Sequence, residues 1–149
     1  MKSVTYEKLK EFKKKYPSTV AWRLKKHARI IDMHLNKDEI IIYAFAAQKN
    51  DNMFDVVSTN AIVLTNKRLI FGTKRLLFGY FFTSITPDMF NDLTVKANVF
   101  WGKLHIDTVK EYVIFSNIQK EALPEIQKHI SEYMLAEKRK FGSREKKAI

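Results

Sequence analysis

Four histidines are the side chains best suited to acid–base chemistry or metal binding, and their spacing favours neither. His27 and His34 lie seven residues apart, which places them on one side of a predicted helix. Two imidazoles alone do not make a zinc site, and no Asp or Glu lies three or four residues beyond His27 to complete one. We therefore predict packing or interface roles for this pair. His105 and His129 are expected to be solvated or paired.

The remaining side chains offer no combination typical of an enzyme. The chain has no cysteine, which excludes disulfides, thiolate catalysis and sulfur-ligated metals. Its four glycines are spread among predicted turns and the tail, so they form no phosphate-binding loop, and no serine has the context of a nucleophile elbow. We therefore predict a non-catalytic protein without a cofactor or a metal.

A short run of basic and apolar residues offers a binding surface instead. Lys74-Arg75 precedes Leu76-Leu77-Phe78 in a predicted hairpin turn, at the same end of the domain as the loop that holds Met53-Phe54. Basic residues beside exposed apolar ones suit a membrane interface or a peptide partner. The alternative is that Leu77 and Phe78 fold inward and close the end of the core. The candidate partner surface comprises Lys74, Arg75, Leu76, Leu77, Phe78, Met53 and Phe54.

The net charge of +11 is confined to the two ends of the chain. Residues 1–35 hold ten basic and three acidic side chains, residues 36–135 hold eleven of each, and residues 136–149 hold six and two. Each basic residue near an anionic membrane contributes roughly 1 kcal/mol, screened by salt. The candidate contacts to an anionic surface are Lys13, Lys14, Lys15, Lys26, Arg29, Lys138, Arg139 and Lys140.

This charge has two other interpretations. Cationic residues in a last helical turn also suit the helix dipole, so the basic clusters can be ordinary solvated helix ends. Nucleic-acid binding is disfavoured, because the centre of the chain is neutral and no strand displays the paired exposed aromatics of a stacking platform. The N-terminus lacks the apolar core of a signal peptide. We expect a cytoplasmic protein, with peripheral attachment at the inner face of the membrane as the alternative.

The elements that must position these residues are organised around Asn60–Gly72, NAIVLTNKRLIFG. Two short β-branched and aromatic runs flank the turn-forming Thr65-Asn66 pair, which predicts a β-hairpin. The strands are predicted at 39–48, 56–65, 67–73, 80–85, 94–101, 103–109 and 111–117, with Gly102 as a turn.

Helices are predicted on both sides of this β region. A basic helix spans 5–16 and ends at Pro17, after which Ser18 can cap a second amphipathic helix that runs to about residue 35. The strand at 39–48 is apolar on both faces and must be covered on both, by these helices or by a second protomer. A long amphipathic helix runs from about residue 121 to 140.

A meander of seven strands closed by one C-terminal helix resembles the pleckstrin-homology (PH) plan. The runs AIVLTNKRLIFGTKRLLFG, VFWGKLHIDTVKEYVIFSNI and ALPEIQKHI resemble the bacterial PH-like domains in particular. The resemblance covers roughly residues 40–133. It departs at 84–93, which is longer and more irregular than the family's usual link into the next strand.

The resemblance implies a fold and a binding role. The fold it implies is α+β, a seven-stranded antiparallel barrel of two orthogonal sheets capped by a C-terminal helix, with two N-terminal helices added. Eukaryotic relatives bind inositol phosphates through basic residues of the first inter-strand loop. Here that loop offers Lys49 against Asp51 and Asp55, so phosphoinositide recognition is disfavoured.

These inferences combine into one functional prediction. The expected organisation is a basic helical extension at 1–36, a PH-like domain at 37–141 and a basic tail at 142–149. The chain is predicted to bind a protein or peptide partner or to self-associate, and no small-molecule substrate is evident. Peripheral attachment to an anionic membrane through the basic flanks and the apolar hairpin tip is the alternative.

Overall fold

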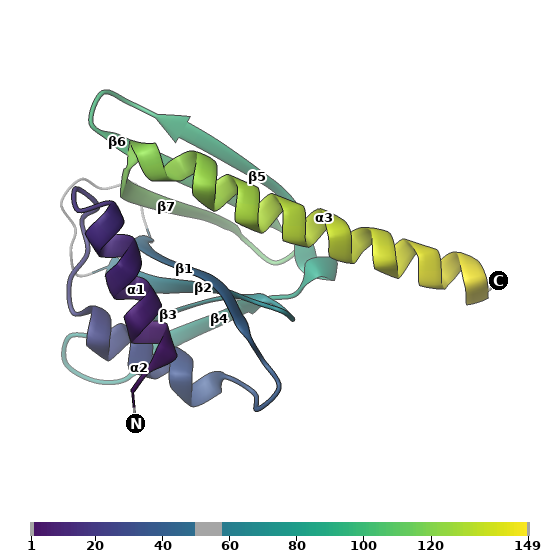
Figure 1. The fold of residues 1–149 in the computed structure, drawn as a ribbon, viewed down its shortest axis with the longest axis horizontal. Coiled ribbons are helices and arrows are strands. Elements are labelled where there is room, and N and C mark those ends of the chain that lie inside the picture. The colour runs from purple at the N-terminus through teal and green to yellow at the C-terminus, as the bar shows by residue number, and fades with distance from the viewer. Residues whose placement is uncertain (1, 50–57, 149) are drawn as a thin grey trace.

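The computed structural model describes residues 2–49 and 58–148, with side chains described as far as residue 140. Its three α-helices flank a β region in which two short 3-10 helices, η2 and η3, make connections (Figure 1). The elements are α1 Val4–Lys15, α2 Leu24–His34, β1 Ile41–Gln48, β2 Thr59–Thr65, β3 Leu69–Lys74, β4 Tyr80–Ile85, η2 Pro87–Met89, β5 Phe90–Ala97, β6 Trp101–Thr108, β7 Tyr112–Gln119, η3 Lys120–Ala122 and α3 Leu123–Ala148.

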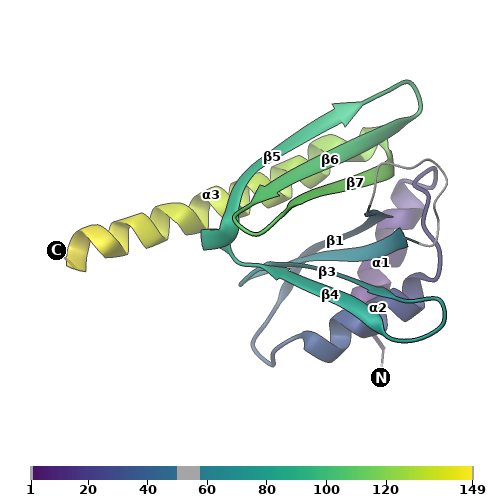
Figure 2. The same cartoon turned by 180° about the vertical axis from the view of Figure 1, so that it is seen from behind.

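Seven antiparallel strands form one curled half-barrel in the order β4-β3-β2-β1-β7-β6-β5. Within the described residues, the two halves of the sheet pair at Gln48 and Ser116, where β1 adjoins β7. Away from this pair the halves diverge, and α3 lies along the half formed by β5–β7 (Figures 1 and 2). The architecture confirms the predicted α+β fold of seven antiparallel strands and a C-terminal helix.

The inner face of the half-barrel encloses the larger hydrophobic core. Alternate strand residues point inward, and one stripe of α3 packs against them. α1 also contributes, because Phe12 and Tyr16 lie in this core, with the Phe12 ring 6.0 Å from that of Phe45. The residues that α3 and the preceding turn bury here are Ala122, Leu123, Ile126, Ile130 and Met134.

A second core lies on the outer face of β1–β3, beneath α1 and α2. Leu9 of α1 and Ile31 of α2 pack there against Ala44, Val63 and Ile70. β1 therefore has both faces covered within one chain, as its apolar pattern requires. The N-terminal helices provide the outer cover, so this strand gives no reason to invoke a second protomer.

The second helix begins later than Ser18 because the preceding segment is bonded to the sheet. The Val20 backbone N–H donates to Asn117 O at 2.9 Å, and Thr19 Oγ1 accepts from the Gln119 N–H at 3.0 Å. These bonds use backbone and side-chain groups that a helix would have needed. Helix α2 starts after Arg23, which adopts a left-handed conformation with φ 53°.

The fifth and sixth strands are shifted toward the N-terminus relative to the prediction. β5 begins at Phe90, so most of the irregular link expected at 84–93 is the 3-10 turn η2 and the first part of a strand. The turn after β5 is made by Asn98, whose Oδ1 accepts from the N–H groups of Phe100 and Trp101 at 2.9 and 2.7 Å. The predicted turn at Gly102 is wrong, because Gly102 lies within β6.

Gly102 instead allows the start of α3 to approach the sheet closely. A Cβ atom at this position would lie 2.4 Å from Leu123 Cδ1, and Leu123 is buried. Replacing Gly102 with Ala is therefore expected to lower the free energy of unfolding by about 1–3 kcal/mol, measured by urea denaturation. In the double variant G102A/L123A the clash is absent. Its loss of stability should therefore be smaller than the sum of the losses measured for G102A and L123A separately. Strict additivity would contradict this account.

Candidate functional site

The Thr65–Arg68 turn, the most distinctive part of the sequence, serves the fold. Arg68 donates to both carboxylate oxygens of Glu39, at 2.7 and 3.2 Å, and to His34 O at 2.8 Å. The Glu39 side chain is 0% exposed and that of Arg68 17%. Burial opposes ionisation of Glu39, but hydrogen bonds from Arg68, Thr65 and Asn36 hold its pKa below the ordinary value. These side chains tie β2–β3 to the segment that leads from α2 into β1.

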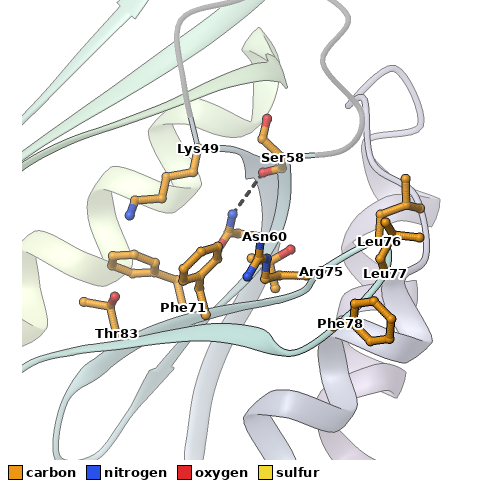
Figure 3. Close-up of a pocket in the computed structure, with 11 residues that line it drawn as sticks. Lys49, Ser58, Asn60, Phe71, Arg75, Leu76, Leu77, Phe78 and Thr83 are labelled. Atoms are coloured by element: carbon orange, nitrogen blue, oxygen red, sulfur yellow. Dashed lines mark hydrogen bonds between the residues drawn. The ribbon is translucent and has the colours of Figure 1, made fainter.

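A cavity of about 650 Å³ lies on the inner face of β2–β4, at the end that carries the β3–β4 turn (Figure 3). We call it the inner-face pocket. Ligand sites in proteins typically measure about 300–1,000 Å³. The pocket is lined by Lys49, Ser58, Asn60, Phe71, Thr73, Arg75, Leu76, Leu77, Phe78, Phe81 and Thr83.

Two aromatic rings in the inner-face pocket each carry a cation. Lys49 Nζ lies 5.2 Å from the centroid of Phe71, and Arg75 Cζ lies 5.3 Å from that of Phe81. Both distances are within cation–π range, where the ring face attracts positive charge. None of the described residues that line the pocket is acidic. Among the described residues, the pocket lining therefore combines apolar walls with two cations and no carboxylate.

The hairpin tip predicted as a partner surface forms one rim of this pocket. Leu77 and Phe78 are 80% and 82% exposed, so they do not fold into the core. Gly79, with φ 75°, allows the tight turn, and the Arg75 N–H donates to its carbonyl at 3.0 Å. Arg75, Leu76, Leu77 and Phe78 line the pocket, whereas Lys74 does not. Met53 and Phe54 lie outside the described residues.

The aromatic residues of the pocket, Phe71 and Phe81, have no distinguishing signal in the sequence. Phe71 and Phe81 alternate along β3 and β4 in the same pattern as core residues nearby. Alternation reports the face on which a side chain lies and not whether another element covers that face. In the sequence, Lys49 is an isolated cation beside two acidic residues. Phe81 is 61% exposed, which only the folded structure reveals.

The predicted anionic-surface contacts do not form one cluster. Lys13 Nζ donates to the carbonyls of Pro17 and Thr19, and burial lowers its pKa. Lys15 pairs with Glu125 at 2.5 Å, and Lys140 pairs with Glu137 at 3.2 Å. The others, Lys14, Lys26, Arg29, Lys138 and Arg139, are exposed.

The two basic ends of the chain also lie apart. α1 and α2 sit against the sheet, while the C-terminal part of α3 extends away from it (Figure 1). A single flat surface would therefore engage one basic region more readily than both.

The histidines have packing contacts. The His34 ring stacks on Phe82 at 4.0 Å, and that of His129 stacks on Tyr43 at 4.3 Å. No three His, Asp or Glu side chains gather into a metal-binding arrangement within the described part of the chain.

His27 of α2 is fully buried against the base of the hairpin tip. Its Nδ1 accepts from the Lys74 backbone N–H at 2.9 Å, and its Nε2 has no partner among the described residues. Since Nδ1 is an acceptor, the neutral ring carries its proton on Nε2. Burial, helped by the charge of Arg23, lowers the pKa of His27 to about 4. The neutral imidazole thus anchors the hairpin tip to α2.

We expect His27 to make the folded state sensitive to acid. The pKa falls from an ordinary 6.5 to about 4 on folding, so the folded state binds fewer protons between these values. Its contribution is therefore full above pH 6.5 and is lost as the pH falls, by about 3 kcal/mol at pH 4. Urea denaturation of the wild type and of His27→Asn, which keeps an acceptor but does not titrate, should show a shallower pH dependence in the variant. Identical slopes would contradict this role.

A half-barrel of seven antiparallel strands closed by a C-terminal helix, with a pocket beside the hairpin turns, defines a protein of the pleckstrin-homology class. The chain belongs to the bacterial PH domain family, whose family model matches residues 35–132. No curated protein sequence matches it. Both α1 and α2 precede the matched region, which begins at residue 35.

Two solved structures share the fold. One is a pleckstrin-homology domain from Shewanella amazonensis, with 20% sequence identity and a TM-score of 0.50, covering 72% of this chain and 95% of that one. The other is a protein with a pleckstrin-homology domain from Shewanella loihica, with 18% identity and a TM-score of 0.50, covering 72% and 89%. At these identities the similarity establishes the fold. Within the described residues, no helix is long and apolar enough to span a membrane.

Proposed function

We propose that this chain is a non-catalytic binding module that takes an acidic, partly apolar segment of a partner protein into the inner-face pocket. The observation that carries the proposal is the pair of cations over aromatic rings, Lys49 over Phe71 and Arg75 over Phe81. Carboxylates would offset this charge, and apolar side chains would cover the exposed Phe81 ring and the hairpin tip. The family's fold is commonly a binding module, which agrees with this role.

Selection of a random peptide library on the immobilised chain tests the proposal. Peptides that combine Asp or Glu with apolar residues should be enriched. Their affinity should fall at least tenfold in the double variant K49E/R75E and should also fall as salt is added, because the attraction is partly electrostatic. Lys110→Glu, a charge reversal at an exposed residue of the β6–β7 turn, should leave affinity unchanged. Enrichment of basic peptides, or equal affinity in K49E/R75E, would refute the proposal.

A second candidate function rests on the exposure of the hairpin tip. Leu77 and Phe78 project beside Lys74 and Arg75, an arrangement that suits insertion into an anionic membrane surface. Vesicle co-sedimentation should then require anionic lipid, fall with salt and fall strongly in L77D/F78D. Equal and negligible binding to neutral and anionic vesicles at low salt would eliminate this candidate.

A further inference from the structure

The two edges of the sheet are protected to different degrees. β5 carries the charged residues Asp92 and Lys96, and its pairing with β6 is interrupted by a register shift between Phe90 and Asp92. Such charges and irregularities are common devices that prevent an edge strand from pairing with another chain. β4, YFFTSI, has no charged residue, no proline and a regular register with β3 throughout. The β4 edge is therefore unprotected.

The hydrogen-bond pattern shows which backbone groups this edge presents. The Arg75 N–H donates to Gly79 O, and the Thr65 N–H donates to Arg68 O. These two bonds show which opposed residues are hydrogen-bonded to each other in the β3–β4 and β2–β3 pairs. Because hydrogen-bonded pairs alternate along antiparallel strands, Phe81, Thr83 and Ile85 face β3. The backbone N–H and C=O groups of Tyr80, Phe82 and Ser84 therefore face outward. Among the described strands, β4 pairs only with β3.

The side chains of β4 place this edge beside the inner-face pocket. Phe81 and Thr83 line the pocket, whereas Tyr80 and Phe82 face α2, where both contact His34. A strand added to the edge would continue this alternation. Every second side chain of the added strand would then lie over the pocket.

We propose that the β4 edge binds an extended acidic segment of a partner protein as an additional strand. This inference rests on the proposed function and specifies its mechanism. Backbone hydrogen bonds to Tyr80, Phe82 and Ser84 would hold the segment, and the pocket would select its side chains. An apolar side chain opposite Thr83 would enter the pocket beside Lys49, whose ammonium group lies over the buried Phe71 ring, and a carboxylate opposite Phe81 would approach Arg75.

Charge favours an acidic partner over a second copy of this chain at the same edge. Each copy carries a net charge of +11, so two copies repel one another, whereas an acidic segment is attracted. Lys49 and Arg75 in the pocket lining strengthen this attraction. None of the described lining residues carries a carboxylate. The occupant we infer is therefore an extended segment that alternates pocket-facing apolar and acidic residues with small β-forming residues.

A designed peptide tests this mechanism without knowledge of the natural partner. The probe is fluorescein-labelled Thr-Leu-Thr-Phe-Thr-Glu-Thr, in which Leu, Phe and Glu share the pocket face and the threonines share the other. In an antiparallel pairing the threonine N–H groups face β4, because directly opposed residues lie on the same face of a sheet. N-methylation of every threonine amide after the N-terminal threonine should weaken binding at least tenfold. N-methylation of the Leu, Phe and Glu amides should be tolerated.

Three further measurements define the outcome. Replacing the probe's Glu by Lys should weaken binding at least tenfold, and so should K49E/R75E in the chain. Amide hydrogen exchange with the parent probe bound should slow at Tyr80, Phe82 and Ser84. It should change little at Phe81 and Thr83, whose amides are already paired with β3. If binding weakens only when the Leu, Phe and Glu amides are methylated, the result would support strand addition in a parallel direction.

Other outcomes would overturn the inference. If both methylated probes bind as well as the parent while K49E/R75E abolishes binding, the pocket binds peptides but β4 adds no strand, so the proposed function survives alone. If the chain forms a dimer that the probe competes with, the edge belongs to a second copy. If no probe binds and anionic vesicles do, the tip is a membrane site and both proposals fail.

Discussion

Replacing Arg68 with Ala is expected to lower the free energy of unfolding by about 3–5 kcal/mol. The reason is that Glu39 would remain buried without its ionic partner, and His34 O would lose a donor. Removing one member of a buried pair costs far more than the pair itself contributes, because the remaining charge stays desolvated. Urea denaturation at neutral pH, monitored by circular dichroism, measures the loss.

The neighbouring Lys67 provides a matched control. It pairs with Asp38 on the surface, where both side chains are largely exposed, so Lys67→Ala should cost less than 1 kcal/mol. Arg68→Lys should fall between the two, because a single ammonium group cannot reproduce the forked contacts to Glu39. A loss below 1 kcal/mol for Arg68→Ala would show that the buried pair is not needed for stability. The distinctive residues of this hairpin would then need another explanation, such as ligand binding.

The substitution Phe12→Ala is expected to cost about 3–5 kcal/mol, although this residue lies outside the matched family region. Phe12 belongs to α1, yet its ring packs in the inner core with Tyr16, Tyr43 and Phe45. Thermal or urea denaturation should reveal the loss.

Lys14→Ala, on the exposed side of the same helix, is the control and should change stability by less than 0.5 kcal/mol. For the same reason, a chain that begins near Asn36 should fail to unfold cooperatively, because it lacks members of both cores. Cooperative unfolding of that shortened chain, with stability near that of the full chain, would contradict the structural role assigned to α1 and α2. Binding experiments should therefore use the full chain with point substitutions.

The N-terminal helices also connect to the candidate site. α2 holds the base of the hairpin tip through the bond between His27 Nδ1 and the Lys74 N–H, and it supports β4 through the stack of His34 on Phe82. The rim of the inner-face pocket and its neighbouring edge are thus positioned in part by α2, which precedes the matched family region. Differences in these helices among family members would be expected to alter the tip and, with it, partner choice.

Most of the helices and strands of this fold can be predicted from local patterns in the sequence. Short β-branched and aromatic runs predicted seven strands, and the 3.6-residue period of Leu123, Ile126, Ile130 and Met134 predicted the closing helix. Periodicity reports a local conformation and the face that must be buried, and both hold whatever lies opposite. The same reasoning required cover on both faces of β1, which α1 and α2 provide.

The location of the candidate site depends on the folded arrangement of the chain. Ser18 failed to cap a helix because backbone groups of β7 were available to its neighbours, and Gly102 was needed for a close helix approach rather than for a turn. Phe71 and Phe81 share an alternating pattern that is typical of core residues. In the folded chain Phe71 is buried, whereas Phe81 is exposed in the pocket lining. Which edge is unprotected, and which cations face a pocket, depend on contacts between residues distant in sequence. Local periodicity does not encode those contacts.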